Sequence, residues 1–414
     1  MQTETRTSAG PRLAPLHTSD GRTRQPRKPK SGCAYTPSPL RPHVLASDRL
    51  RDWTTPHGLR WAAQQKAALG ERVFLHMHEV MISSVEPATR NNSGAGLLRF
   101  TQFCDSLGIS EDSRMPASDS LLAAFASSAA AQVSGKSAAH WLMGLHMWHT
   151  LQGAEWLGGE LVKHALAGVA KLTPPSSRRP QRPPITIAHI EALFKGLDLT
   201  NSRDSAVWAV ASIAFWGCCH LGELIVQSEG DFNPRRNVTR GVDIHFREAE
   251  GAVSFASFHL LFTKTTREAG ADLSLTHIAH ATSPVHALRH QLKANSQVPA
   301  DAPLFAFQTV DGWSPMTKPW FMAICNQVWG DAKLDTVKGG HSFRIGSATE
   351  LLLRGMPPDV VALQGCWRSD AFLLYWRKIE SILPMFISRS FYSSSSASVR
   401  TAMDSFASRY RLSH

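Results

Sequence analysis

Apolar side chains recur at helical spacing between residues 48 and 171. Within 96–104 and 138–151 they follow one another at intervals of three and four positions, which is typical of an amphipathic helix. Ser118 and Asp119 precede an alanine-rich segment and suit the N-terminus of another helix. No alternation of apolar and polar residues appears in this part of the chain. The pattern therefore predicts a small, wholly helical domain.

The rest of the chain combines helical and strand patterns. Helical periodicity appears in five stretches, 187–197, 205–226, 285–293, 320–329 and from 341 onward. Alternating apolar and polar residues predict three strands, 242–246, 253–262 and 271–275. The longest apolar run, 206–219, is too short to span a bilayer and predicts a buried core helix. The expected fold class is therefore mainly α with a small antiparallel sheet.

Shifts in composition divide the 414 residues into five segments. Residues 1–47 are rich in Pro, Ser and Arg, and we expect a disordered leader there. Residues 174–186 form a proline-stiffened linker, and residues 391–414 form a serine-rich tail. The two folded segments are then a helical domain, 48–173, and a mixed domain, 187–390.

Basic side chains are in excess and gather in the leader and the linker. The formal net charge is +11 and the sequence pI is about 9.6, which favours a polyanionic partner such as nucleic acid. The leader is either a solvated tail or a phosphate-binding arm, and Arg27–Lys30 resembles a nuclear-import signal. Arg178, Arg179 and Arg182 lie either on a solvated tether or on a strap that contacts duplex DNA.

The cysteines and the opening residues indicate a cellular compartment. The six cysteines form no C-x-x-C pair, so we expect reduced and mostly buried thiols. The opening MQTETRTSAG lacks the apolar stretch of a signal peptide. We therefore expect a soluble protein of a reducing compartment, with no membrane partner. The scattered histidines show no metal-ligand spacing, so no metal is expected.

The densest cluster of polar chemistry begins at His341. His341 and Arg344 stand three positions apart, so on a helix they share one face. Gly355 suits the end of that helix and Pro357 the start of the next, which gives a helix-turn-helix shape. By itself the pair fits a DNA-reading motif, or a helix cap beside a surface charge. Tyr375 is the only tyrosine between residues 48 and 390.

The order of these residues resembles the catalytic domain of tyrosine recombinases, the phage-integrase family. Lys264 is followed by H-x-x-R at His341, then by Gly-x-Trp ending at Trp367, then by Tyr375. The phrases CCHLGEL, FTKTTREAGADL, GGHSFRIGSATELLLRG and LQGCWRSDAFLLYWRKIESILP are most similar to fungal mobile-element members, Crypton-like or retroelement-associated. The helical segment resembles the family's core-binding domain, so the resemblance covers residues 48–390.

The resemblance implies a fold, a reaction and an assembly. The fold is a helical core-binding domain joined to an α+β catalytic domain. The reaction is breaking and rejoining of double-stranded DNA through a 3′-phosphotyrosyl link, without metal or small-molecule cofactor. The assembly is a tetramer on two duplexes, and a fungal member of the family would act in the nucleus.

The resemblance also assigns a role to each residue of the motif. Tyr375 would be the nucleophile. Its covalent link to the phosphate would retain the energy of the broken bond, so rejoining would need no ATP. Arg344 would bind the non-bridging phosphate oxygens with its planar fork of donors. His341 would act as acid, base or hydrogen-bond donor, and Trp367 would pack and donate its indole N–H. Lys264 would protonate the leaving 5′-oxygen.

Two departures from the family pattern bear on catalysis. The interval from Trp367 to Tyr375 is one residue shorter than expected. In CCHLGEL, His220 takes the place of the first catalytic arginine, whereas Glu223 still matches the expected acid. We therefore expect a tyrosine recombinase whose catalysis is impaired. The alternative is a catalytically inactive DNA-binding protein on a recombinase scaffold. A helix-turn-helix transcription factor is a weaker third interpretation, since it leaves Lys264 and Tyr375 without a role.

Overall fold

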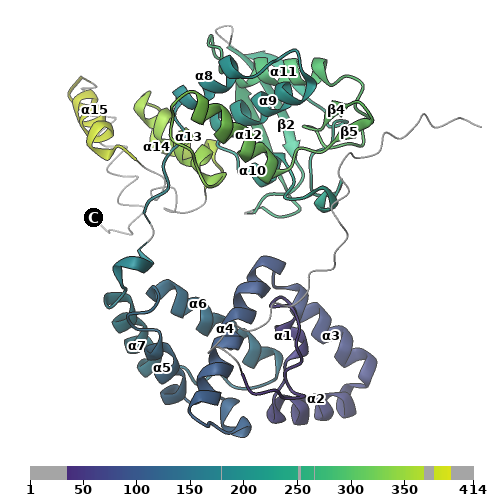
Figure 1. The fold of residues 1–414 in the computed structure, drawn as a ribbon, viewed down its shortest axis with the longest axis vertical. Helices are drawn as coiled ribbons and strands as arrows, with labels where there is room; N and C mark the ends of the chain where they lie inside the picture. The colour runs from purple at the N-terminus through teal and green to yellow at the C-terminus, as the bar shows by residue number, and fades with distance from the viewer. Residues whose placement is uncertain (1–34, 179, 250–252, 265, 368–376, 393–414) are drawn as a thin grey trace, which may run out of the picture. The chain divides into compact units, whose positions relative to one another are not determined.

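The chain folds into two compact units. The structure, a computed structural model, describes residues 35–178, 180–249, 253–264, 266–367 and 377–392. Described residues up to Pro180 form the first, here called the helical unit, and those from Gln181 onward form the second, the mixed unit (Figure 1). The division falls inside the segment expected to be a linker.

The helical unit contains helices and, among its described residues, no strand, as the periodicity predicts. Its helices are α1 (Arg49–Asp52), α2 (Pro56–Leu69), α3 (Glu71–Ser83), α4 (Pro87–Ser106), α5 (Asp119–Ser128), α6 (Gly135–Leu151) and α7 (Glu160–Lys171). Short 3₁₀ turns lie at Glu111–Arg114 and Pro175–Ser177. The predicted N-cap at Ser118 is confirmed, because its side chain accepts a hydrogen bond from the Leu121 amide.

One close helix contact and one buried pair of tryptophans contribute to the core of the helical unit. Helices α4 and α6 approach so closely that a Cβ on Gly144 would lie 2.7 Å from the Cα of Ser93. Trp53 and Trp148 are buried, and the Trp148 indole donates a 3.0 Å hydrogen bond to the Trp53 carbonyl. The apolar face of α6 therefore packs inward, as its helical spacing predicts.

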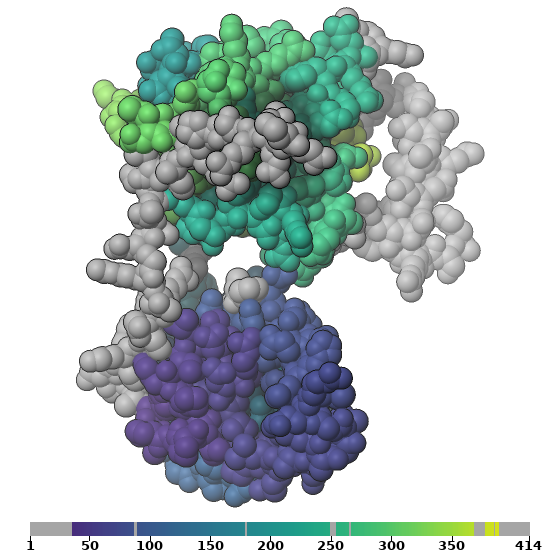
Figure 2. Space-filling model, turned by 90° about the vertical axis from the view of Figure 1, so that its right-hand side faces the viewer, coloured from purple at the N-terminus to yellow at the C-terminus, as the bar shows by residue number. Residues whose placement is uncertain are grey.

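Residues 35–47 belong to the helical unit, so the predicted end of the leader at residue 47 is wrong. The Tyr35 ring lies 5.7 Å from the Trp53 ring. Arg41 is only 3% exposed, and its Nη1 donates a 2.6 Å hydrogen bond to Glu111. The first described residues, purple in Figure 2, form a continuous surface with the blue helices that follow. Composition misplaced the boundary because it carries no information on tertiary contacts. The segment is ordered by one aromatic contact, of Tyr35 with Trp53, and by one acidic partner, Glu111, of Arg41.

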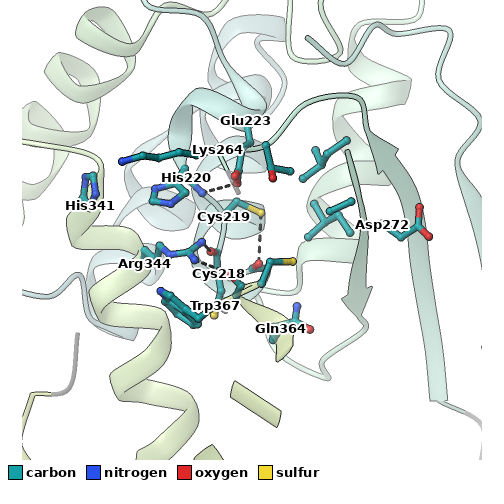
Figure 3. Close-up of a pocket in the computed structure, with 17 residues that line it drawn as sticks. Cys218, Cys219, His220, Glu223, Lys264, Asp272, His341, Arg344, Gln364 and Trp367 are labelled. Carbon is teal, nitrogen blue, oxygen red and sulfur yellow. Dashed lines mark hydrogen bonds between the residues drawn. The ribbon is translucent and has the colours of Figure 1, made fainter. Parts of the chain in front are cut away.

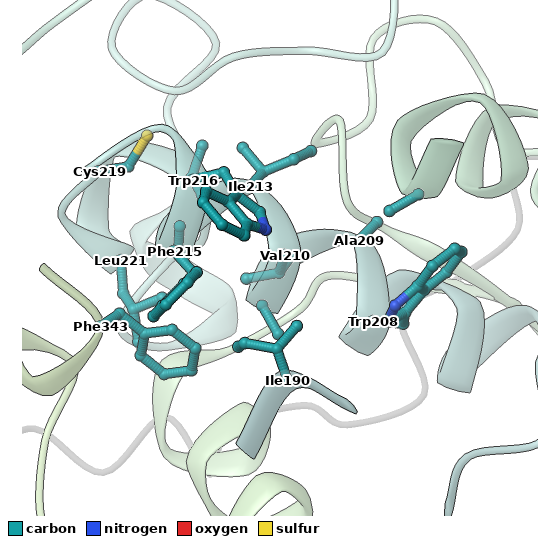
Figure 4. Close-up of a cluster of buried hydrophobic side chains, with 14 of the residues drawn as sticks. Ile190, Trp208, Ala209, Val210, Ile213, Phe215, Trp216, Cys219, Leu221 and Phe343 are labelled. Atoms are coloured by element: carbon teal, nitrogen blue, oxygen red, sulfur yellow. The ribbon is translucent and has the colours of Figure 1, made fainter. Parts of the chain in front are cut away.

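The mixed unit is built around α9 (Ser202–Trp216). Every residue of this helix from Asp204 to Trp216 is buried, which confirms the predicted core helix. Figure 4 shows its apolar side chains against Ile190, Leu221 and Phe343. The surrounding helices are α8 (Ile187–Gly196), α10 (Leu221–Leu224), α11 (Pro284–Ala294), α12 (Lys318–Asp331), α13 (His341–Leu353), α14 (Pro358–Gln364) and α15 (Ile379–Tyr392), with a 3₁₀ turn at Glu229–Asp231.

A three-stranded antiparallel sheet lies beside these helices, as expected. Its order is β1 (His245–Ala249), β2 (Val253–Leu260) and β3 (Ala271–Thr276). The first strand was predicted three residues too early, because the alternation already begins at Val242. A second hairpin, β4 (Phe307–Thr309) with β5 (Gly312–Ser314), was not predicted. Strands of three residues are too short to show a period of two.

The helix predicted over 205–226 is interrupted. Helix α9 ends at Trp216, and α10 begins only at Leu221. Cys218 lies between them with a φ of 51°, a left-handed conformation that a helix cannot contain. The apolar pattern continues through this break, so periodicity alone did not reveal it. The break brings residues 217–220 to one edge of a cavity.

Candidate functional site

A cavity of about 310 Å³ in the mixed unit holds most of the residues that the motif singled out (Figure 3). Its walls come from the α9–α10 break, the β2–β3 turn, the start of α13 and the end of α14. The predicted site residues that line it are His220, Glu223, Lys264, His341, Arg344 and Trp367. The proposed nucleophile, Tyr375, lies outside the described residues.

Arg344 is buried and is held by main-chain oxygens. Its Nη1 donates a 2.6 Å hydrogen bond to the Cys218 carbonyl, and its Nη2 donates to the Gly365 carbonyl. The side chain of Arg344 is 5% exposed, and its buried Nε has no hydrogen-bond partner among the described residues. A buried, unpaired donor is costly unless a ligand accepts from it. The guanidinium is therefore held in a fixed position beside the cavity, and its Nε–H is left as an unused donor.

Trp367 lies against this guanidinium because of the two residues before it. The Arg344 guanidinium carbon is 4.0 Å from the centre of the Trp367 ring, which is a cation–π contact. A Cβ on Gly365 would lie 2.0 Å from the Trp367 ring, so glycine is required there. Cys366 has a φ of 52° and turns the chain between them. The Gly-x-Trp pattern is thus a turn that places the indole on Arg344.

His220 stands at the N-terminus of α10. Its backbone N–H donates a 2.8 Å hydrogen bond to Oε2 of Glu223, so the acid of the motif fixes the start of this short helix. The His220 and His341 rings are 5.3 Å apart at an interplanar angle of 66°. In Figure 3 both rings lie at the same end of the pocket as Lys264.

Burial and nearby cations lower the pKa of both histidines. Burial, followed by the charge of Arg344 and those of the other cations around the pocket, lowers the pKa of His220 to about 3. Partial burial, and then the charges of Arg182 and Lys318, lower the pKa of His341. Burial raises the pKa of Glu223. Near neutral pH the side chain at position 220 is therefore an uncharged imidazole.

Lys264 lies on the turn between β2 and β3, where the sequence placed it. The turn is closed by two hydrogen bonds between Thr263 and Arg267, of 3.0 Å and 3.3 Å. The Lys264 side chain is exposed and extends alongside His220 in Figure 3. Its charge contributes to the lowered pKa of both His220 and His341. The ammonium group therefore acts on the cavity although it comes from a flexible side chain.

The three linker arginines fall in different parts of the chain. Arg178 belongs to the helical unit and Arg182 to the mixed unit, whereas Arg179 lies outside the described residues. The strap that carries Arg182 is anchored three residues later, where the Ile185 amide donates a 2.9 Å hydrogen bond to the Ser342 carbonyl. This anchor lies on the first turn of α13, next to His341. Arg182 is thereby part of the surroundings of the cavity.

Several groups that shape the pocket were not found from the sequence. The carbonyls of Cys218 and Gly365 are main-chain atoms and leave no mark in a motif. Lys318, the first residue of α12, acts on both histidines and belongs to no pattern that we recognised. Only the Pro at the second position of α12 marks that the helix begins there.

The described residues offer N–H donors and positive charge to this cavity, which suits an anion. In the parts of the chain that the structure describes, no group of three or more His, Cys, Asp or Glu side chains is placed to hold a metal ion. Over the same residues no helix combines the length and apolar character needed to cross a membrane.

Comparison with known proteins gives the fold. No protein-family model matches the sequence, and no curated protein matches it. Among solved structures the chain is similar to the XerH site-specific recombinase bound to a palindromic difH substrate, with a TM-score of 0.50, 11% identity, and coverage of 83% of this chain and 93% of that one. It is also similar to the Tn1549 transposon integrase in complex with a circular intermediate DNA (TM-score 0.46, 14% identity, coverage 81% and 100%). The XerH match shows that this chain shares the fold of that site-specific recombinase, and the mainly helical fold with a small antiparallel sheet is as expected.

Proposed function

We propose that this protein is a DNA-binding tyrosine recombinase that breaks and rejoins DNA strands through a 3′-phosphotyrosyl link. One observation carries this function: six motif residues drawn from four separate segments line a single cavity. These residues form one site because they present hydrogen-bond donors and charge to the same cavity. The XerH fold supports the same reading.

The pocket suits a phosphodiester in the following way. Arg344 donates to the non-bridging oxygens, and its fixed position means that no reorganisation is needed when charge develops there. The Tyr375 hydroxyl gives its proton to His341 as its oxygen attacks phosphorus, and the bond from phosphorus to the 5′-oxygen breaks. Lys264 gives a proton to that leaving oxygen, and His341 supplies a further hydrogen bond. The phosphotyrosyl bond retains the energy of the broken bond, so rejoining runs by the reverse steps.

Further parts of the proposal concern the setting of the reaction. Arg178, Arg179 and Arg182 bind backbone phosphates of the duplex, which positions it without reading its sequence. The family resemblance supports a tetramer on two duplexes and an origin in a fungal mobile element. Arg27–Lys30, outside the described residues, supports a nuclear location.

A second function has its own observation in its favour. His220 is neutral near pH 7, with a pKa of about 3, whereas an arginine there would bring a permanent charge. The alternative is accordingly a DNA-binding protein that uses the same fold without cleaving strands. Both functions include binding of duplex DNA.

One experiment separates the two. The full chain is incubated with a pool of nicked duplexes of random sequence, in which the nick traps any covalent intermediate, and adducts are separated on denaturing gels. The recombinase predicts an adduct that maps to Tyr375 and disappears in Tyr375→Phe. Binding of the same pool at two salt concentrations should weaken with salt in both proteins, since phosphate contacts supply most of the affinity. Binding without any adduct would favour the inactive DNA-binding protein.

A further inference from the structure

The side chain of Gln364 joins three segments of the mixed unit. Gln364 is the last residue of α14, and its amide nitrogen donates a 3.0 Å hydrogen bond to the Ser274 carbonyl in β3. The same nitrogen donates a longer hydrogen bond, of 3.4 Å, to the carbonyl of Trp216, the last residue of α9. One amide group therefore holds the end of α14 to both the sheet and the core helix.

The acceptor on β3 lies on the free edge of the sheet. β3 is an edge strand, and its neighbour is β2. The His277 amide donates to the Ser254 carbonyl across this pair, and main-chain groups that face the partner strand alternate along a strand. Ser274 lies three positions before His277 and therefore directs its carbonyl away from β2. Gln364 gives this edge carbonyl a donor.

The chain that follows Gln364 belongs to the cavity of the motif residues. Gly365 accepts a hydrogen bond from Arg344, and the Trp367 ring lies on the same guanidinium. Arg344 also donates to the carbonyl of Cys218, in the break that follows α9. The turn after α14 is thus attached to the end of α9 and to this break at adjacent points, once through Gln364 and once through Arg344.

The attachment to β3 extends to Lys264. Lys264 lies on the turn that leads into β3, and this turn is closed by the hydrogen bonds between Thr263 and Arg267. β3 is paired with β2 along its whole length, so the hairpin is one ladder. In Figure 3 Gln364 and Lys264 lie at opposite ends of the pocket. Holding Ser274 to α14 therefore limits how far the hairpin, with Lys264, moves from the turn after α14.

We propose that Gln364 is a positioning residue, which fixes the hairpin of Lys264 and the turn of Trp367 relative to each other around the phosphate bound by Arg344. This role rests on the proposed function, since that phosphate is the scissile phosphate of DNA. A misplacement of about 1 Å in a reacting group is enough to slow a reaction strongly. A residue that sets the distance between two such groups therefore affects the rate without touching the substrate.

Methionine is the replacement that isolates the hydrogen bonds. Gln364 lines the cavity of the motif residues and also a second cavity of about 430 Å³, whose walls include Ile278, Leu351 and Met356. Methionine is an unbranched side chain of similar length and has no N–H donor. Gln364→Met therefore removes both hydrogen bonds while a side chain still fills the place between the two cavities.

Inorganic phosphate tests the role without a target sequence or strand cleavage. It is titrated at constant ionic strength into the full chain carrying isotope-labelled histidine, and the resonances of His220 and His341, which line the cavity, report binding. Gln364→Met is expected to weaken phosphate binding by about three- to tenfold, because the charged donors no longer converge on one anion. The matched control is Gln327→Met, at an exposed position of α12, which should leave the affinity unchanged.

A purely structural role gives a different result. If Gln364 only stabilised the fold, Gln364→Met would lower the unfolding temperature and leave the phosphate affinity of the folded protein at the native value. That result would overturn the proposal. Thermal unfolding is therefore measured for each variant, and the titrations are run well below the lowest unfolding temperature.

The Trp367→Ala background tests the route by which Gln364 acts. Without the indole, the position of the turn matters less to Arg344, so Gln364→Met should cost less phosphate affinity there than in the native chain. Equal costs in the two backgrounds would contradict an action through this turn.

Nicked duplexes extend the test to catalysis. Gln364→Met should slow adduct formation at saturating DNA by about ten- to hundredfold, the effect of a misplaced group. The DNA concentration that gives half the maximal rate should stay within about twofold of the native value, since the other phosphate contacts supply most of the affinity. A change confined to that concentration would contradict positioning. Weakened phosphate binding in Gln364→Met, in a chain that forms no adduct, would remove strand cleavage from the proposed function and leave Gln364 as a positioning residue of an anion site.

Discussion

The guanidinium of Arg344 is bound to the main-chain carbonyl of Cys218, with 2.6 Å between Nη1 and the oxygen. Cys218 itself has a left-handed backbone, with a φ of 51°, in the break between α9 and α10. The break therefore serves two purposes. It turns a carbonyl toward Arg344, and it starts α10 at the position where His220 faces the cavity. An uninterrupted α9 would provide neither.

Arg344→Lys should lower the stability of the mixed unit as well as its affinity for phosphate. A lysine cannot bond the Cys218 and Gly365 carbonyls at once or stack on Trp367, so buried acceptors lose their donors. The expected loss of unfolding free energy is about 1–3 kcal/mol, measured by urea denaturation. Arg354→Lys is the control, since Arg354 lies just after the same helix, half-exposed and paired with Glu350. Equal stability of the two variants would mean that Arg344 has no structural role.

Gly346→Ala should displace the strap that carries Arg182 from α13. A Cβ at this position would lie 1.9 Å from the Ile185 carbonyl oxygen, which is a main-chain atom that cannot rotate away. We expect a loss of about 1–3 kcal/mol in unfolding free energy and faster hydrogen exchange of the Ile185 amide. Gly330→Ala, in α12 with no atom within 4 Å of the new Cβ, should not destabilise the protein. Protection of the Ile185 amide in Gly346→Ala would show that the strap is attached in another way.

His149 should make the helical unit sensitive to acid. The imidazole is fully buried, Nδ1 lies 2.8 Å from the Leu145 carbonyl, and Nε2 accepts from the Ala117 amide at 3.1 Å. Burial lowers its pKa from 6.5 to about 4. Between these values the unfolded chain binds a proton that the folded chain does not, so stability falls as the pH falls from 6.5 toward 4.

His149→Gln should therefore flatten the dependence of stability on pH in this window, followed by urea unfolding with tryptophan fluorescence. The control is His164→Gln on α7, because the His164 side chain is 81% exposed. It should keep the native slope. A slope that is the same in His149→Gln and in the native chain would show that His149 is not the group responsible.

The sequence predicted which residues gather at the pocket better than it predicted what holds them. The motif singled out four residues of the pocket, His341, Arg344, Trp367 and Lys264. Their order along the chain can be recognised without knowing where each helix begins or ends. The partners of Arg344 are carbonyls, and the φ of Cys218 is a backbone property, so neither has a side-chain pattern. Arg41 is buried because it forms a hydrogen bond with Glu111, which lies 70 residues further along the chain. Such pairings depend on tertiary structure, which periodicity does not contain.

The surroundings of His220 disfavour a charged imidazole. Burial and the charges of Arg344, His341, Lys264 and Lys318 all disfavour its protonated form, and its pKa falls to about 3. Glu223 bonds the His220 amide rather than its ring. Lowering the pH from 8 to 5.5 therefore leaves the imidazole uncharged in the DNA-free protein. Any dependence of cleavage on pH in this range must therefore come from groups other than His220.

His220→Arg should accelerate adduct formation on nicked duplexes by about 10²–10³, the effect of restoring one preorganised donor to a phosphoryl-transfer site. Arginine remains charged throughout the range from pH 5.5 to 8, so the gain over the native chain should be constant across it. The added cation stands near those of Arg344, Lys264 and Lys318, so without DNA the variant should unfold more readily than the native protein, and bound phosphate should reverse that difference. His220→Gln, a neutral side chain that still offers an N–H, is the matched control and should resemble the native chain in rate. Rapid cleavage by the native protein that His220→Arg leaves unchanged or slows would show that position 220 does not contact the phosphate.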